Sequence, residues 1–171
     1  MRHQRSGPRA PNGLALVAAI ALATILGACQ AAGVAPTPSP SGGIIRQDLG
    51  NVLPATAQGQ RLGLWHYTIP AGSALVPHHH PGWQVARIVA GTLTYQILKG
   101  EATVIRGSGA TETHKTSETI TLATGDSIIE NPDLEHFGSN SGTTAVEIYA
   151  ASLFTDGQPP AIPRASPSTA P

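Results

Sequence analysis

The chain of 171 residues carries ten basic and ten acidic side chains, and only 12% of its residues are charged. This length supports one folded core and is too short for two domains once the ends are set aside. Three arginines lie within residues 1–28, which leaves seven basic against ten acidic side chains, a net charge of −3 with histidine neutral. That balance provides no basic patch, so we expect no nucleic-acid partner and no electrostatic binding to an anionic lipid surface.

Residues 1–28 have the pattern of a secretory signal peptide. Arg2, Arg5 and Arg9 give a positive start, and Leu14 to Leu26 is a nearly unbroken apolar run. The run is shorter than the roughly 20 residues that a permanent membrane-spanning helix needs. We therefore expect the segment to be cleaved after export.

The sequence LGAC, Leu26 to Cys29, closes this run and resembles the lipobox of bacterial lipoproteins. The resemblance implies that Cys29 is lipidated and becomes the new N-terminus. Cys29 is the only cysteine, so the chain has no internal disulfide. Buried acyl chains stabilise membrane binding by about 0.8 kcal/mol per methylene, and several would hold an exported domain at a membrane of the cell envelope, outside the cytoplasm. The alternative is an ordinary signal peptide with an incidental cysteine.

Composition divides the remaining chain into three parts. Residues 29–43 are small, polar and proline-rich, which is typical of a tether. Residues 156–171 have the same character and are expected to form a disordered tail. The folded domain is therefore predicted to span residues 44–155.

Hydrophobic residues within residues 44–155 alternate with a period of two rather than 3.6. Short β-rich runs such as TLTYQI, TVIRG, ETITLATGD and TAVEIYAASLF are separated by glycine-containing turns. No segment has the pattern of an amphipathic helix. The sequence predicts an all-β sandwich or barrel without a substantial helix.

Three of the seven histidines are consecutive, in the segment PHHHPGWQ of residues 77–84. In a strand, residues i and i+2 share a face, so His78 and His80 should point one way and His79 the other. Gln84 can return to the face of His80. Two imidazoles at this spacing can supply two ligands to one metal ion.

The stretch from Gly72 to Gly91 resembles the first motif of the cupin superfamily, G-x5-H-x-H-x3-E-x6-G. His78 and His80 are in register, and Gln84 stands at the usual glutamate position. Residues 125–140 resemble the second motif, G-x5-P-x-G-x2-H-x3-N. The residues that match the second motif are Gly125, His136 and Asn140. Asn131 and Asp133 stand at the positions of its proline and second glycine.

The resemblance implies a double-stranded β-helix, or jelly-roll cupin barrel, that holds one divalent transition metal. Its metal-binding residues correspond here to His78, His80 and His136, with Gln84 as a fourth candidate. An amide offers only a weak neutral oxygen or a hydrogen bond. Three neutral imidazoles favour Zn, Fe, Ni or Cu over Mg or Ca and leave positions open for a small anionic ligand or substrate.

Two functions remain open at this point. One is a metal-dependent, dioxygenase-like oxidoreductase, for which Glu130 and Glu135 are candidate proton acceptors; Glu135 is expected to face away from the metal. No catalytic residue is assigned. The other is a non-catalytic module that binds or senses a metal or small ligand at the cell surface. The fold alone does not decide between them.

Three further residues are pocket candidates: Tyr67, Tyr95 and His66. The alternative for each is packing between strands. Trp83 has the opposite parity to Gln84 and could pack against another sheet or a second subunit. The resemblance to cupins makes a homodimer a further expectation.

Overall fold

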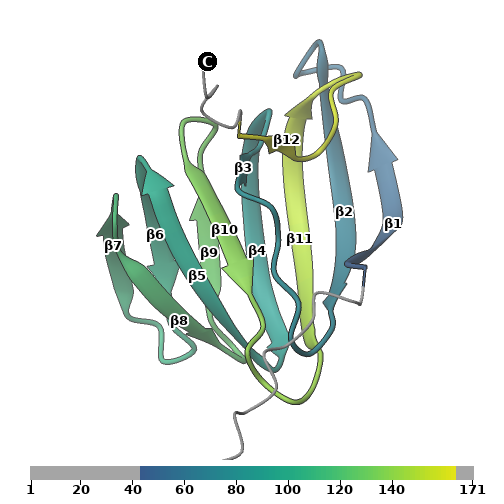
Figure 1. Cartoon of the computed structure of the whole chain (residues 1–171). Helices are drawn as coiled ribbons and strands as arrows, with labels where there is room; N and C mark the ends of the chain where they lie inside the picture. Colours follow the sequence, from purple (N-terminus) through teal and green to yellow (C-terminus); the bar gives the residue numbers. More distant parts are fainter. Residues whose placement is uncertain (1–42, 165–171) are drawn as a thin grey trace, which may run out of the picture. The chain divides into compact units, whose positions relative to one another are not determined.

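A computed structural model describes residues 43–164, and this part of the chain folds entirely from β-strands. The twelve strands of this range are β1 (Ile45–Val52), β2 (Gln60–Ile69), β3 (His78–His79), β4 (Gly82–Ala90), β5 (Thr92–Lys99), β6 (Glu101–Ile105), β7 (Thr111–Lys115), β8 (Thr119–Ala123), β9 (Ser127–Glu130), β10 (Glu135–Ser139), β11 (Val146–Thr155) and β12 (Ile162–Pro163) (Figure 1). Residues 43–164 contain no helix, so the all-β prediction is confirmed.

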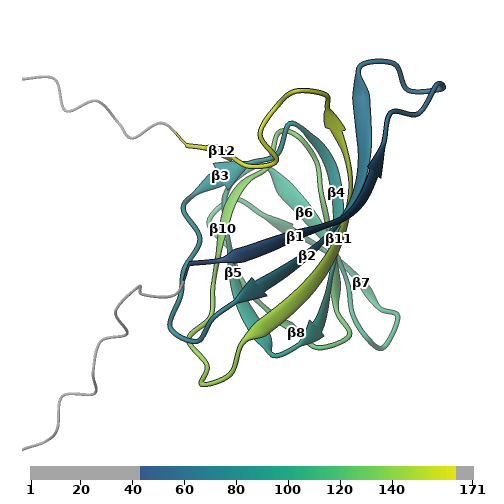
Figure 2. The ribbon, with the colours of Figure 1, turned by 90° about the vertical axis from the view of Figure 1, so that its right-hand side faces the viewer.

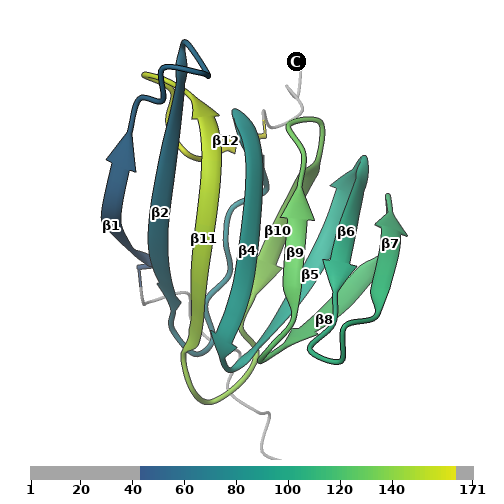
Figure 3. The same ribbon diagram turned by 180° about the vertical axis from the view of Figure 1, so that it is seen from behind.

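The strands form two antiparallel sheets that face each other. The larger sheet has the order β1-β2-β11-β4-β9-β6-β7, which Figure 3 shows from behind, and the smaller has the order β12-β3-β10-β5-β8. Figure 2 shows the two sheets curving around a common interior, with β1 running across the side between them. This is the double-stranded β-helix, or jelly-roll barrel, that the sequence predicts.

Alternate side chains of strands such as β4, β5 and β8 point inward and fill the interior. In β4 the residues at even positions from Gly82 to Ile88 are buried and those between them are exposed. The inward aliphatic side chains of both sheets form one core. Its fully buried members include Ile69, Ile88, Ile97, Leu122, Leu134, Val104 and Val146.

The outer face of the larger sheet exposes apolar side chains on neighbouring strands. Trp83 on β4 is 54% exposed, and Leu62 and Leu64 on β2 are similarly open. The register of β11 places Leu153 between Leu62 and Trp83. Trp83 thus faces away from the barrel interior. The homodimer stays a prediction.

The C-terminal boundary differs from the one expected from composition. Residues 156–164, assigned from sequence to the disordered tail, lie on the barrel: β12 pairs with β3, and the backbone N–H of Arg164 donates to the carbonyl of Pro77 at 2.8 Å. The edge of β3 supplies backbone partners that composition does not reveal. The signal segment, Cys29, most of the tether and residues 165–171 lie outside the described range. Within that range there is no helix long and apolar enough to cross a membrane.

Candidate metal centre

The three predicted histidine ligands meet in the barrel interior. His78 is the first residue of β3, and His80 comes directly after the end of that strand. His136 on β10 pairs in register with His78. Each is at most 6% exposed. One nitrogen from each ring lies within 4.8 Å of the other two. His79, in the strand between the first two, is half-buried and lies outside this group.

Backbone carbonyls orient two of the imidazoles. The Nδ1 atom of His78 lies 2.7 Å from the carbonyl oxygen of Val76, and Nδ1 of His80 lies 2.6 Å from that of Pro160. A carbonyl can only accept, so each Nδ1 carries the hydrogen. This leaves the Nε2 lone pair of the neutral ring available for a metal, as in other histidine sites with backbone-bonded rings.

A buried carboxylate joins the histidines from a neighbouring strand. Glu130 on β9 stands opposite Gln84 on β4 in the sheet register. Its Oε2 lies 3.2 Å from Nε2 of His80, and its Oε1 lies 3.4 Å from Nε2 of His136. Glu130 is 3% exposed. The negative charge that Gln84 lacks is therefore supplied by its cross-strand partner.

The amide of Gln84 is turned toward this carboxylate. Its Nε2 donates to Oε2 of Glu130 at 2.7 Å and lies 3.2 Å from Nε2 of His80. The reversed amide would place two acceptor oxygens in contact, so the carboxylate fixes the orientation. Oε1 of Gln84 is buried and has no hydrogen-bond partner among residues 43–164. Coordination by Gln84 stays a prediction, whereas its hydrogen bond to Glu130 orients that carboxylate.

Aromatic rings pack against the centre. The hydroxyl of Tyr95 donates to Oε1 of Glu130 at 2.8 Å, and its ring stacks on His136 with centroids 4.8 Å apart. Phe154 stacks on His80 at 5.3 Å. Glu130 thus has a donor on each oxygen, from Tyr95 and Gln84, and it is held by hydrogen bonds on both sides.

Burial and charge set the protonation of the group. Burial lowers the pKa of His136 to about 4 and also lowers that of His78. Burial would raise the pKa of Glu130, but the charges of His136 and His80 and the hydrogen bonds hold it below its usual range. For His80, burial lowers the pKa, while the stronger combined effect of Glu130 raises it overall.

This donor set suits a divalent transition metal. Neutral imidazole nitrogens are preferred by Zn, Cu, Ni and Fe, and the ionised Glu130 would offset part of the charge of a bound ion within the buried site. From the sequence alone, Glu130 is only a candidate proton acceptor close to His136. Its place in the centre follows from the pairing of β4 with β9, and the alternation of Ile128 and Glu130 with outward neighbours is the signal that could have indicated it.

A cavity of about 110 Å³ adjoins the centre. Its wall is mostly apolar and includes Ile69, Leu75, Ala86, Ile88, Leu93, Leu122, Ile128, Ile148, Ala150, Pro160 and Ala161. The pocket candidates Tyr67 and Tyr95 both line it. The structure places His66 elsewhere: its Nε2 lies 2.7 Å from Oε2 of Glu147, and its ring stacks on Tyr149.

The other candidate acid lies outside the cavity. Glu135 forms ion pairs with Lys99 at 3.6 Å and with Arg164 at 3.2 Å, and its side chain is 21% exposed. It therefore points away from the imidazoles, as its position beside His136 in a strand requires.

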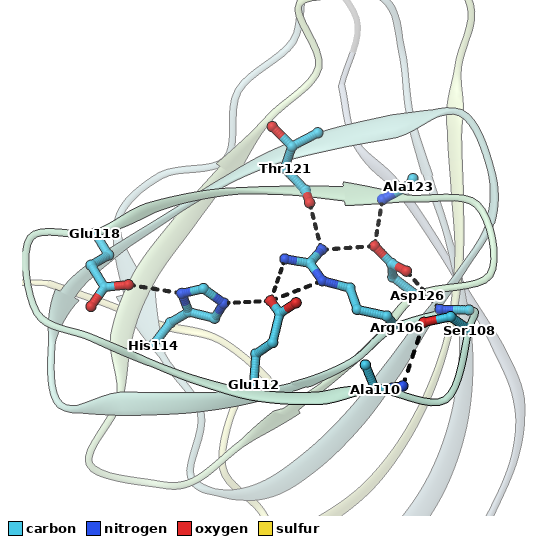
Figure 4. Close-up of polar contacts among 10 residues, drawn as sticks. Arg106, Ser108, Ala110, Glu112, His114, Glu118, Thr121, Ala123 and Asp126 are labelled. Atoms are coloured by element: carbon cyan, nitrogen blue, oxygen red, sulfur yellow. Dashed lines mark hydrogen bonds and ion pairs between the residues drawn. The ribbon is translucent and has the colours of Figure 1, made fainter.

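A polar cluster supports the strand that carries Glu130. Asp126, directly before β9, accepts hydrogen bonds from the backbone N–H groups of Gly107 and Ala123 and from the guanidinium of Arg106 (Figure 4). Arg106 also binds Glu112 on β7 at 2.6 Å. These contacts tie the turn before β9 to the β6–β7 hairpin and thereby fix where β9 begins.

Comparisons with known proteins add a likeness of fold. No protein-family model matches the sequence, and no curated protein is similar to it at a significant level. Among solved structures, a cupin 2 domain-containing protein from Halorhodospira halophila is 14% identical with a TM-score of 0.47, over 72% of each chain. A cupin 2 conserved barrel domain protein from Leptotrichia buccalis is 15% identical with a TM-score of 0.45, over 66% of this chain and 42% of that one.

A variant of salicylate 1,2-dioxygenase from Pseudoaminobacter salicylatoxidans is 14% identical with a TM-score of 0.45. The match covers 64% of this chain and 26% of the dioxygenase. This chain therefore spans less than half of the Leptotrichia protein and of the dioxygenase. The interpretation of the site rests on its own residues.

Proposed function

We propose that the chain is a single-domain member of the cupin superfamily that binds one divalent transition metal through His78, His80 and His136. The observation that carries this proposal is the convergence of three buried imidazoles, two of them with Nδ1 bonded to a backbone carbonyl. Glu130 contributes the negative charge. Zn, Fe, Ni and Cu all suit such a set of donors.

We further propose dioxygenase-like oxidoreductase chemistry on a small anionic substrate. A bound transition metal would supply Lewis acidity and, for Fe or Cu, redox activity. The protein's own contribution is binding and orientation: the apolar cavity excludes water from the substrate, and the Glu130 carboxylate places a negative charge beside the imidazoles. Tyr95 and Gln84 hold that carboxylate in place through the hydrogen bonds described above.

A non-catalytic metal-binding or ligand-sensing module is the second candidate. The small volume of the cavity and the hydrogen-bonded, strongly acidic Glu130 favour it, because a carboxylate that holds two donors and has a low pKa is a weak base. The two candidates share the same centre. They differ in whether substrate turnover follows binding.

Oxygen uptake distinguishes them. The protein, loaded separately with Fe, Cu, Ni or Zn, is supplied with diketone, flavonol and thiol substrates beside a matched His136→Ala variant. Metal-dependent oxygen consumption with product formation that His136→Ala abolishes supports the oxidoreductase. Metal binding without consumption for any metal and substrate leaves the binding module as the function.

We also propose export and lipid anchoring at Cys29, supported by the lipobox-like LGAC sequence. Mass spectrometry of the mature N-terminal peptide from the membrane fraction tests this. An acylated Cys29 is expected, and a Cys29→Ser variant should leave the membrane fraction. An unmodified cysteine in a released protein contradicts the anchor.

A further inference from the structure

An arginine side chain lines the cavity wall. Arg46 on β1 is an exposed residue that also lines the cavity, and it stands opposite Tyr67 in the sheet register. Its guanidinium carbon lies 4.9 Å from the centroid of the Trp65 ring. Among residues 43–164, Arg46 forms no ion pair with a carboxylate, whereas Arg61 and Arg106 both do.

Tyr67 connects this cation to the metal centre. Arg46 stands opposite Tyr67 in the register of β1 and β2, so its positive charge acts on the phenol, and the charge of Glu130 also acts on it. Burial raises the pKa of Tyr67 to about 12, so its hydroxyl keeps the proton at neutral pH and can donate a hydrogen bond. Both side chains line the same cavity as the three imidazoles.

The wall between the two polar ends is apolar. Ile148 pairs with Tyr67 in the larger sheet, and Ile88 pairs with Ile148. A ligand that extends from Arg46 toward His136 would therefore pass along aliphatic side chains. Such a surface stabilises hydrocarbon and rejects additional charges along its length.

We propose that Arg46 and Tyr67 bind the carboxylate of a small ligand whose apolar body occupies the cavity beside the three histidines. A guanidinium offers paired donors that match the two oxygens of a carboxylate, and the phenol adds a third. The inference deepens the proposed function and rests on it, because it assigns the substrate class of the same cavity. The class is a monocarboxylate with a compact apolar group.

Benzoate and butyrate, with the neutral controls benzamide and butyramide, are suitable probes. Dissociation constants are measured by NMR titration of metal-free and metal-loaded protein for the parent, Arg46→Gln, Arg46→Lys and Tyr67→Phe. Arg87→Gln is the matched control, because Arg87 is exposed on β4 outside the cavity, bonded to Ser127 rather than to a carboxylate. Circular dichroism and metal content are recorded for every variant.

We expect Arg46→Gln to weaken carboxylate binding by about tenfold or more, with smaller losses for Arg46→Lys and Tyr67→Phe and none for Arg87→Gln. The amides should bind weakly to all of them. Failure of the parent to bind either carboxylate at millimolar concentration would overturn the inference. So would carboxylate binding by Arg46→Gln as tight as by the parent, or a loss of affinity in Arg87→Gln equal to that in Arg46→Gln. Amides that bind the parent as tightly as the acids would also overturn it. Metal content reports on the proposed function separately: a metal-free parent whose carboxylate binding still depends on Arg46 contradicts the metal centre alone.

Discussion

Position 84 holds an amide where the resembled motif has a glutamate. The buried carboxylate of the site is instead Glu130, the cross-strand partner of Gln84. Two ionised carboxylates at the 2.7 Å separation of these side chains would repel each other strongly, and one would hold a proton. An amide opposite the carboxylate avoids that repulsion and donates a hydrogen bond instead. The sheet register therefore allows one carboxylate in this pair, on either strand.

Exchanging the two side chains tests this interpretation. Glu130→Gln removes the buried negative charge and should weaken metal binding by about tenfold to hundredfold. Gln84→Glu crowds two carboxylates and should also weaken it. The double variant Gln84→Glu with Glu130→Gln restores one carboxylate and one amide, so it should bind metal more tightly than Glu130→Gln alone. Competition titration with a chromophoric chelator measures the dissociation constants; a double variant no better than Glu130→Gln contradicts the exchange.

Individual histidines were predictable from sequence because their spacing is local. The period-two parity of a strand placed His78 and His80 together, and the second motif supplied His136. The position of Glu130 beside them depends on which strand pairs with β4 and in which register. That is a long-range property, and 46 residues separate Gln84 from Glu130 along the chain.

The C-terminal segment contributes to the candidate metal centre. Pro160 supplies the carbonyl that accepts from Nδ1 of His80, and Pro160 and Ala161 line the cavity. This role was not predictable from composition, since residues 156–164 show no alternation and are rich in proline. Their order comes from pairing with β3 rather than from an apolar face of their own.

Truncation provides a direct test of this element. A chain that ends at Gln158 lacks the Pro160 carbonyl and β12, so we expect metal affinity to fall by about tenfold to hundredfold. A chain that ends at Arg164 keeps both and is the matched control, with affinity equal to the parent. Isothermal titration calorimetry measures both. Equal affinity of the shorter chain would show that the carbonyl does not orient His80.

The β6–β7 hairpin contains a histidine between two acids. His114 lies 2.9 Å from Oε2 of Glu112 through Nε2 and 2.8 Å from Oε2 of Glu118 through Nδ1. These hydrogen bonds, that to Glu112 first, raise the pKa of His114. A raised folded-state pKa means that its stabilisation is complete below the unfolded value of about 6.5 and is lost as pH rises through the folded value.

NMR titration of the His114 ring should therefore give a pKa above about 6.5, and Glu112→Gln should lower it. The urea midpoint of the parent, relative to His114→Gln, should decline as pH rises through that pKa. Arg106 also contacts Glu112, so Arg106→Gln is a control for the effect of the neighbouring cation. A His114 pKa at or below the ordinary value contradicts the contribution of the two acids.

The strands were predictable because apolar and polar residues alternate along them, and the apolar residues are the ones whose side chains are buried. The alternating segments correspond to β5, β6, β8 and β11, and glycine-containing turns separate them. Sheet order was not deducible from that pattern alone, since it depends on pairing between segments far apart, such as β2 with β11. The expectation of a jelly-roll barrel came from the resemblance to the two cupin motifs.

At the scale of the whole molecule, the barrel brings β3, β4, β9 and β10 around one centre. A metal that binds only the folded state stabilises it by RT ln(1 + [L]/Kd), about 2.7 kcal/mol at a concentration of 100 Kd. The melting temperature should therefore rise by several degrees on addition of the preferred metal. Differential scanning calorimetry measures this, with His136→Ala as the control. An equal rise in that variant would indicate binding elsewhere.

The most direct test of the three-histidine centre is elemental analysis of the protein purified without a histidine tag, beside His80→Ala, His136→Ala and the matched control His79→Ala. The structure leads us to expect about one transition-metal ion per chain in the parent and in His79→Ala, and loss of that ion in the other two variants. A parent that stays metal-free after reconstitution with Zn, Fe, Ni and Cu would contradict the centre, as would a loss in His79→Ala equal to that in His80→Ala.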